Sequence, residues 1–519
     1  MEQSSLSYKT FKNVSYSFIG FVVPIVFSVF ITPVIVHKLG VAEYGVLILT
    51  NTIMGFLGLL DLGLTAGVVK KICEYYALHK LEVLQKMLST ANSTFWIIGL
   101  INFLIFFISG KFFLKSFNIV ANENLFLVFI LVGFTSFLTA INSVHTSIPQ
   151  ALQRFDIVNK INLTQLLIYN LGALGLALLG FQLKAILALN LITVIGLSLA
   201  YRFYSRKILP EIKLKFLWDF LELKQLYGFG IFTAIANIGM SAVNQFDRLL
   251  IPIFLGPTQL TYYSLPGNVA QKTTTVVGSL GGTFFPLANE LSAKGEVERL
   301  GVIFRKVIRN LAVLASATTV SIILFGNKIL LYWLGEDFAL AGTKILYILA
   351  ITYFLLSLFG IAFNFLMGLN QQKVVAKWSL LMAGVNFLLL LVLLKPFGIL
   401  GAAWAYLGSA LPIIGLFYWM EKKVFFFQDI AKFYGKLFLK LFVTAVLFVV
   451  IVGFTLWEWT NSFTSLVLFG PIAVLLYLII YWSLGFMEAE DEQLFRGFGI
   501  KILERFKLSN TSSNEDIRN

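Results

Sequence analysis

Two charged residues, Asp247 and Arg248, interrupt the apolar run "NQFDRLLIPIFLG" at residues 244–256. An arginine guanidinium recognises phosphate and carboxylate groups through paired hydrogen bonds, and a carboxylate can bind a cation. At helical spacing, one face of this segment carries a stripe of polar side chains. The members of the stripe are Thr233, Asn237, Ser241, Asn244 and Arg248. Asp247 lies about 100° round the helix from Arg248, at the edge of the stripe.

Three further apolar segments carry polar faces of the same kind. The first holds Asn268, Gln271, Lys272 and Thr275. The second holds Asn51, Gly55, Gly58, Asp61 and Thr65, and the third holds Ser17, Gly20, Pro24, Ser28 and Thr32. Such faces are expected where several helices line a shared aqueous cleft. Pro24 and Pro33 would bend the helix that carries them, which suits a hinge or, equally, a static kink.

Each of the charged residues also has a simpler explanation. Arg248 and Lys272 lie near the ends of their segments, so their side chains could extend to the lipid head groups, with Asp247 as a local neutralising partner. Asp61 could pair with Lys70 or Lys71. The small polar residues and glycines could serve helix packing alone. The sequence leaves these alternatives open.

Several kinds of chemistry are excluded by residue type and spacing. The single cysteine, Cys73, excludes an internal disulfide and a CxxC site, and the three histidines are scattered along the chain. Neither a Gly-x4-Gly-Lys-Ser/Thr phosphate loop nor an HExxH zinc motif occurs. We therefore expect no cofactor and no metal.

The composition predicts a membrane protein with many spans. Of the 519 residues, 58% are hydrophobic and 13% are charged, whereas soluble domains have about 45–50% and 25%. Apolar runs of roughly 20 residues recur along the whole chain, as bilayer-spanning helices require. The breaks between them predict about fourteen spans. These spans are 14–36, 44–67, 89–109, 124–144, 161–180, 184–202, 229–254, 265–287, 309–326, 343–368, 378–395, 399–420, 438–457 and 463–486.

The basic residues predict the orientation, because Lys and Arg accumulate in cytoplasmic loops. With the N-terminus inside, most of the 40 Lys and Arg residues fall in the two termini and the even-numbered loops. The odd-numbered loops hold only Lys38, Lys111, Lys115, Lys184, Lys328, Lys344 and Lys395. Both termini are therefore predicted to be cytoplasmic. The net charge of +14 follows this topology and gives no reason to expect a nucleic acid partner.

Three motifs recur in order at a nearly constant offset of 216–217 residues. They pair "HKLGVAEYG" (37–45) with "IFLGPTQLTYY" (253–263), "CEYYA" (73–77) with "NELSA" (289–293), and "LQRFDIVNK" (152–160) with "LNQQKVVAK" (369–377). Because six spans separate the copies, both enter the membrane in the same direction, and transporters of this build bind substrate between their halves. We predict an all-α membrane protein with an N-lobe (1–215), a C-lobe (216–425), an added helix pair (426–490) and a cytoplasmic tail (491–519).

The segments "LGVAEYG" (39–45) and "LLDLGLTAG" (59–67), with "LQRF" (152–155) and "NQFDRLLI" (244–251), resemble the polysaccharide-transport flippases. That family belongs to the superfamily of multidrug and toxin extrusion exporters, and the resemblance covers spans 1–12 and the added pair. It implies translocation of a polyprenyl-diphosphate-linked repeat unit of O-antigen, capsule or exopolysaccharide across the bacterial inner membrane by alternating access. One departure is the absence of arginine from the first span, where flippases of peptidoglycan precursors carry basic residues.

By this resemblance, Arg248 and Lys272 would face a cationic cleft and attract the diphosphate. Asp61 and Asp247 would hold the two cations apart or bind a coupling H⁺ or Na⁺, and Asn51, Asn237, Asn244, Asn268 and Gln271 would line the same cleft. The expected partners are the lipid-linked glycan, membrane lipids and polysaccharide-assembly proteins. The alternative function is a cation-coupled drug exporter of the same superfamily. An enzyme would need acid, base or metal groups in sizeable external loops, but the outer carboxylates here are dispersed.

Overall fold

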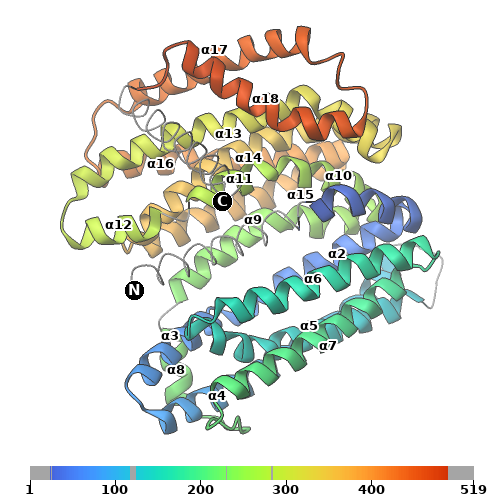
Figure 1. Ribbon diagram of the computed structural model, residues 1–519, viewed down its shortest axis with the longest axis vertical. Coiled ribbons are helices and arrows are strands. Elements are labelled where there is room, and N and C mark those ends of the chain that lie inside the picture. The colour runs from blue at the N-terminus through green and yellow to red at the C-terminus, as the bar shows by residue number, and fades with distance from the viewer. Residues whose placement is uncertain (1–23, 25, 117–123, 229–230, 282–283, 489–519) are drawn as a thin grey trace, which may run out of the picture.

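The computed structural model describes residues 24, 26–116, 124–228, 231–281 and 284–488. Within these ranges the chain forms helices and no strand. The predicted start of the first span and the tail at 491–519 lie outside them. After an apolar helix at Val26–Leu39, the first group of helices gathers at one side of the molecule (Figure 1). It comprises α2 (Val41–Leu57), η1 (Gly58–Asp61), α3 (Leu64–Ala77), α4 (Leu81–Ser116), α5 (Asn124–Ala151), α6 (Phe155–Leu178) and α7 (Leu183–Ile208).

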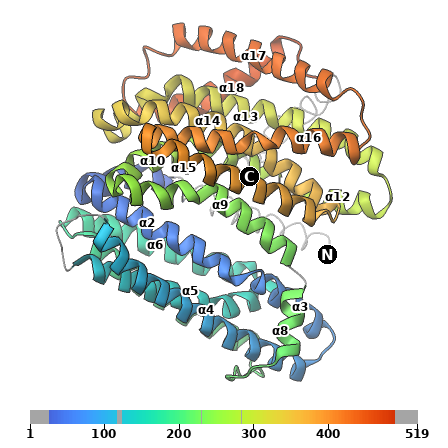
Figure 2. The same ribbon diagram turned by 180° about the vertical axis from the view of Figure 1, so that it is seen from behind.

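The short helix α8 (Phe220–Gly228) leads to a second group of helices on the other side of the molecule, as Figure 2 also shows. The second group comprises α9 (Ile231–Leu255), α10 (Pro257–Ala270), α11 (Lys272–Gly281), α12 (Phe284–Ala293), α13 (Val297–Leu334), α14 (Glu336–Gly368), α15 (Gln372–Ala410) and α16 (Pro412–Lys423). The added pair, α17 (Ile430–Thr455) and α18 (Phe463–Ser483), packs at the outer edge of the second group through α13.

The all-helical membrane fold predicted from the sequence is confirmed. Ten helices of the described chain are long and apolar enough to cross a bilayer, and the total of fourteen spans stays a prediction. The polar helix α9 is not among the ten. Three predicted spans are not continuous helices. Span 2 breaks at Leu62 and Gly63, whose φ angles are 48° and 82°. Span 8 is divided into α10, α11 and α12, and span 12 is interrupted before Pro412, because proline cannot donate the helical hydrogen bond.

The backbone repeats its unusual conformations at the spacing of the sequence motifs. Residues with positive φ occur at Gly40 and Gly256 (85° and 88°), and again at Gln153 and Asn370 (55° and 57°). Gly40 and Gly256 also share their ψ angles, 154° and 165°, and each precedes the first turn of a helix, α2 and α10. A duplicated chain produces such pairs, because each turn residue keeps its place in both copies.

The two groups touch where α2 lies against α9 and α10. Gly45 of α2 permits this approach, because a Cβ atom there would lie 2.0 Å from the carbonyl oxygen of Pro257. The Thr261 hydroxyl of α10 donates to the carbonyl oxygen of Val41, at 2.7 Å. Farther along α2, the rings of Phe56 and Phe246 stack with centroids 5.8 Å apart. A hydrogen bond from a side-chain hydroxyl to a backbone carbonyl, together with close backbone packing, therefore joins the groups at the end where α2 and α10 begin.

The helix α8 packs on α3 and α4 of the first group. Its Leu226 is fully buried, and the Leu226 carbonyl oxygen lies 2.5 Å from where a Cβ atom of Gly67 would be. The predicted lobe boundary at residue 215 thus precedes a helix that packs with the N-terminal part of the chain.

Candidate functional site

The polar stripe of α9 is bonded mainly within the second group of helices. Asn244 accepts a 2.7 Å hydrogen bond from the Tyr406 hydroxyl of α15 and donates one of 2.7 Å to the carbonyl oxygen of Met240. Asn237, two turns earlier, is exposed. The stripe therefore has one exposed amide and one amide that fixes α9 to α15.

Arg248 points into the helix bundle. Its Nη2 atom donates to Oδ1 of Asn268 on α10, at 3.1 Å. The hydroxyl groups of Tyr353, Tyr263 and Tyr406 are its main electrostatic neighbours besides Asp247. The charge of Arg248 also acts on Tyr44 of α2, across the contact between the two groups. The side chain is thus held by protein groups beside that contact.

Asp247 is almost completely buried, with 2% of its surface exposed. Its Oδ1 atom accepts from the backbone N–H of Arg248 at 2.7 Å, and no ion pair joins the two described side chains. The Tyr263 hydroxyl faces Asp247 but forms no hydrogen bond of good geometry. The cluster therefore contains a carboxylate and a guanidinium side by side, each partnered mainly by neutral groups.

Lys272 begins α11, after the exposed residue Gln271. The side chain is half-buried, and it forms no hydrogen bond or ion pair with any residue in the described part of the chain. Burying a charge is costly unless a partner offsets the loss of water. Lys272 is therefore a cation available to a ligand.

Asp61 and Asn51 lie apart from this cluster. The Oδ1 atom of Asp61 accepts from the backbone N–H of Thr65 at 2.8 Å, so Asp61 satisfies the start of α3. Lys71, one of its expected partners, pairs instead with Glu74 at 3.0 Å. Asn51 is exposed on α2. Within the described residues, neither Asp61 nor Asn51 contacts Arg248 or Lys272, and their roles in the site stay predictions.

Pro33 has a consequence that the sequence alone does not reveal. It has no N–H group, so the carbonyl oxygen of Val29, four residues earlier, lacks its helical partner. That oxygen accepts a 2.7 Å hydrogen bond from the indole of Trp333 on α13. The neighbouring Phe30 contacts Phe463 of α18, with ring centroids 5.8 Å apart. The first helix is thereby bonded to the second group. Pro24 is helical, and its role as a hinge remains a prediction.

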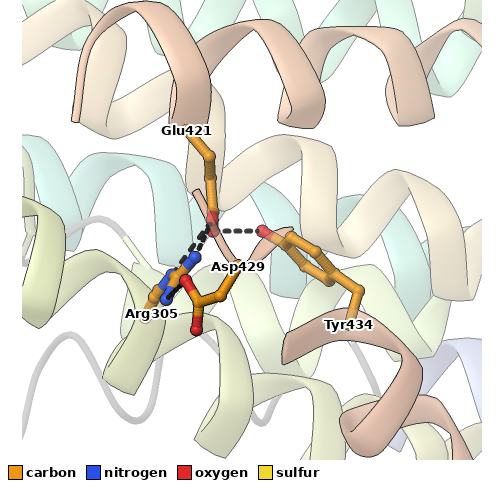
Figure 3. Close-up of polar contacts among 4 residues, drawn as sticks. All are labelled: Arg305, Glu421, Asp429 and Tyr434. Atoms are coloured by element: carbon orange, nitrogen blue, oxygen red, sulfur yellow. Dashed lines mark hydrogen bonds and ion pairs between the residues drawn. The ribbon is translucent and has the colours of Figure 1, made fainter. Parts of the chain in front are cut away.

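A second charged cluster, shown in Figure 3, joins α13, α16 and α17. Arg305 donates to Oε2 of Glu421 from Nε and Nη2, at 3.0 and 2.6 Å, and to Oδ1 of Asp429 at 2.8 Å. Tyr434 donates to the other oxygen of Glu421 at 2.9 Å. The hydrogen bond from Arg305 lowers the pKa of Asp429 below its ordinary value. Every charge has a partner, so this cluster fastens the added pair and offers no free group.

The described helices form a polytopic membrane protein with two groups of helices and buried charges beside the contact between them, an architecture that transporters built from parallel repeats share. The chain belongs to the polysaccharide biosynthesis protein family, whose model matches residues 34–343, more than half of the chain. The resemblance drawn from "LGVAEYG" and "LLDLGLTAG" is confirmed.

Two relatives carry names that describe glycan transport. A Shigella flexneri protein named "Putative O-antigen transporter" is 24% identical over 396 residues, which cover 76% of this chain and 93% of that protein. A Haloferax volcanii protein named "Probable low-salt glycan biosynthesis flippase" is 26% identical over 187 residues, 36% of this chain and 39% of that one.

Two solved structures share the fold. The inward closed lipid II flippase MurJ has a TM-score of 0.68 at 12% identity, covering 91% of this chain and all of that one. An inward-facing multidrug transporter of the MATE family has a TM-score of 0.66 at 13% identity, covering 77% and 94%. The names of these two relatives and of the two solved structures describe transport, and none of them names an enzyme.

The sequence singled out Arg248, Asp247 and Asn268, and the structure brings these three together. Sequence reasoning did not single out the tyrosines that surround Arg248, which come from α10, α14 and α15. These residues are far apart in the chain and meet only in the folded protein, so no local pattern identifies them. The indole of Trp333 was missed for the same reason. The proline rule could have identified the free Val29 carbonyl, but not its partner.

Proposed function

We propose that the protein translocates a polyprenyl-diphosphate-linked oligosaccharide, a repeat unit of O-antigen, capsule or exopolysaccharide, across a bacterial inner membrane. The observation that supports this proposal is the pair of cations on α9 and α11. Arg248 is held by neutral groups and Lys272 has no described partner. Asp247 is the carboxylate next to Arg248, so the charges of these three side chains sum to a net positive charge. An anionic head group would supply the missing counter-charge.

A physical barrier explains why such a site is needed. A diphosphate and several sugars lose their hydration in hydrocarbon, and each polar group without a partner costs several kcal/mol. A polar path between the two groups of helices would replace the lost hydrogen bonds, while the polyprenyl chain stays in the lipid. No covalent step is required. The contact at Gly45 and Thr261 would open and close in alternating access, with Pro24 and Pro33 in the first helix as the hinge.

The proposal includes an orientation and an energy source. The distribution of basic residues supports a cytoplasmic position for both termini. Asp247 and Asp61 are the carboxylates through which H⁺ or Na⁺ would be coupled. Polysaccharide-assembly proteins would receive the translocated glycan.

The test is a translocation assay in liposomes that contain the purified protein and a lipid-linked oligosaccharide. A glycosidase that cannot cross the membrane, added outside, measures how quickly protected glycan becomes accessible. The wild-type protein should accelerate exposure relative to protein-free liposomes, and Lys272→Glu should reduce the rate more than Lys272→Gln because it reverses the charge. Lys344→Glu, at an exposed residue of α14, is the matched control and should transport normally.

Two results would contradict the proposal. Equal losses from Lys272→Glu and Lys272→Gln would assign Lys272 to packing rather than to charge recognition. Accumulation of organic cations driven by an ion gradient, with no movement of the lipid-linked glycan, would favour the drug-exporter alternative.

A further inference from the structure

A cavity of about 750 Å³ lies within the first group of helices, away from α9 and α11. Its walls come from α4, α5, α7 and the extended segment 209–219 that follows α7. Ligand sites usually have volumes of about 300–1,000 Å³, so the cavity is large enough for a lipid head group. We call it the basic pocket, after Arg202, Arg206, Lys213 and Lys215, which line it.

The extended segment forms a fixed wall of the basic pocket. The backbone N–H groups of Lys215 and Leu217 donate to the hydroxyls of Ser89 and Ser93 on α4, at 3.2 and 3.0 Å. Alternate side chains of an extended chain point to opposite sides. Ile212 is buried in the apolar core, whereas Lys213 and Lys215 are exposed and line the basic pocket.

Positive charge gathers here, and no acidic residue is among the described residues that line the basic pocket. Arg202 and Arg206 are one turn apart on α7, where like charges repel each other. In the described part of the chain, none of the four cations of the basic pocket forms an ion pair. Asp219, at the end of the segment, is already paired with Lys86 at 2.6 Å, and that hydrogen bond lowers the pKa of Asp219. The fold thus leaves four cations open to an anion.

A buried histidine adds an independent indication of a ligand. His145 of α5 lines the basic pocket, is only 6% exposed, and its Nδ1 atom has no hydrogen-bond partner. Its backbone carbonyl is occupied by the Ser205 hydroxyl at 2.8 Å, so the ring alone remains unsatisfied. Buried polar atoms normally have partners. Because protein encloses Nδ1, this atom would reach an oxygen of a bound ligand after the ring turns toward the cavity.

We propose that the basic pocket binds the phosphoryl head group of a membrane lipid. The phosphate oxygens would bond to the four cations and to His145. The acyl or prenyl chain would extend from the pocket along Trp96 and Phe216, which line it and are 39% and 73% exposed. Basic pockets between membrane helices bind anionic head groups in this way. The lipid is either a bulk anionic phospholipid or a polyprenyl diphosphate. This site lies outside α9–α11 and does not depend on the proposed transport.

The test measures lipid binding by the full-length protein in detergent, with dioctanoyl phosphatidylglycerol, dioctanoyl phosphatidylcholine and farnesyl diphosphate as probes. Native mass spectrometry counts the bound lipids at increasing concentration. The variant is Arg202→Gln with Arg206→Gln. Its matched control is Lys432→Gln with Lys436→Gln, an exposed pair at the same spacing on α17.

The wild-type protein should bind one phosphatidylglycerol or farnesyl diphosphate saturably and more tightly than phosphatidylcholine. The arginine variant should bind about tenfold more weakly or worse, and the control should match the wild type. Tighter binding of farnesyl diphosphate than of phosphatidylglycerol would identify the lipid as a polyprenyl diphosphate. Tighter binding of phosphatidylglycerol would identify it as a phospholipid. If the arginine variant does not fold, Lys213→Gln with Lys215→Gln takes its place. Equal binding by variant and wild type, or equal losses in variant and control, would overturn the proposal.

Discussion

Replacing Arg248 with alanine should abolish transport, but the same change also removes stability, and the structure indicates how to separate the two effects. The substitution breaks the 3.1 Å hydrogen bond to Asn268 and leaves Asp247, 2% exposed, without its neighbouring cation. Removing one member of a buried charge pair costs about 3–5 kcal/mol. Because no direct ion pair joins Asp247 and Arg248, the lower end of that range applies.

The double variant Asp247→Asn with Arg248→Gln removes both charges together. The asparagine oxygen can still accept from the backbone N–H that now bonds to Asp247 at 2.7 Å, and glutamine is an uncharged donor. The loss of stability should therefore fall to about 1 kcal/mol, the net value of one hydrogen bond. The cationic group for the diphosphate would nevertheless be gone.

Both properties can be measured on the same purified protein. The midpoint of thermal unfolding in detergent reports stability, and the glycosidase assay in liposomes reports translocation. We expect Arg248→Ala to lower both, and the double variant to recover most of the midpoint while remaining inactive. A double variant that translocates glycan at the wild-type rate would refute the role of Arg248 in transport and leave it a structural residue.

Two further substitutions test the contacts that hold the added pair and the first helix. Arg305→Met leaves the fully buried Glu421 without its cation and should destabilise the protein by about 3–5 kcal/mol. The control Arg299→Met, at an exposed ion pair, should cost less than about 1 kcal/mol. Equal midpoints of thermal unfolding for the two variants would contradict the assigned role of the cluster. Trp333→Phe removes the donor to the Val29 carbonyl oxygen, so it should lower the unfolding midpoint by the equivalent of about 1 kcal/mol and alter the translocation rate. An unchanged translocation rate would show that this hydrogen bond does not limit the opening of the contact between the two groups of helices.

The helical membrane fold could be predicted from the sequence because the bilayer imposes it. Backbone groups in hydrocarbon must bond within their own segment, so apolar runs of sufficient length become helices. The breaks were harder to predict, because they depend on short-range geometry. Leu62 adopts a left-handed conformation that its residue type gives no reason to expect. Proline interrupts span 12 just before α16, whereas Pro149 and Pro252 lie inside continuous helices.

The candidate site could be predicted only in part. Helical spacing correctly placed Asn244 and Arg248 on one face of α9, since that relation is local. The packing of Asn244 against Tyr406 depends on a residue 162 positions away, and periodicity contains no information about such distances. The same limit applies to the basic pocket, whose segment 209–219 resembles an ordinary basic loop until its hydrogen bonds to Ser89 and Ser93 are known.

The repeat places the charged site in one half of a duplicated scaffold. At the offset that joins Gly40 to Gly256, Arg248 corresponds to Thr32 and Lys272 to Phe56. Both residues of the first copy are uncharged, and Phe56 stacks on the second group. Burying a charge is costly unless a partner offsets the loss of water, so charging both copies would increase that cost. At these two corresponding positions, only the second copy carries cations. In the proposed transport, recognition of the diphosphate would therefore depend on Arg248 and Lys272 of the second copy, with Thr32 and Phe56 as their uncharged counterparts in the first.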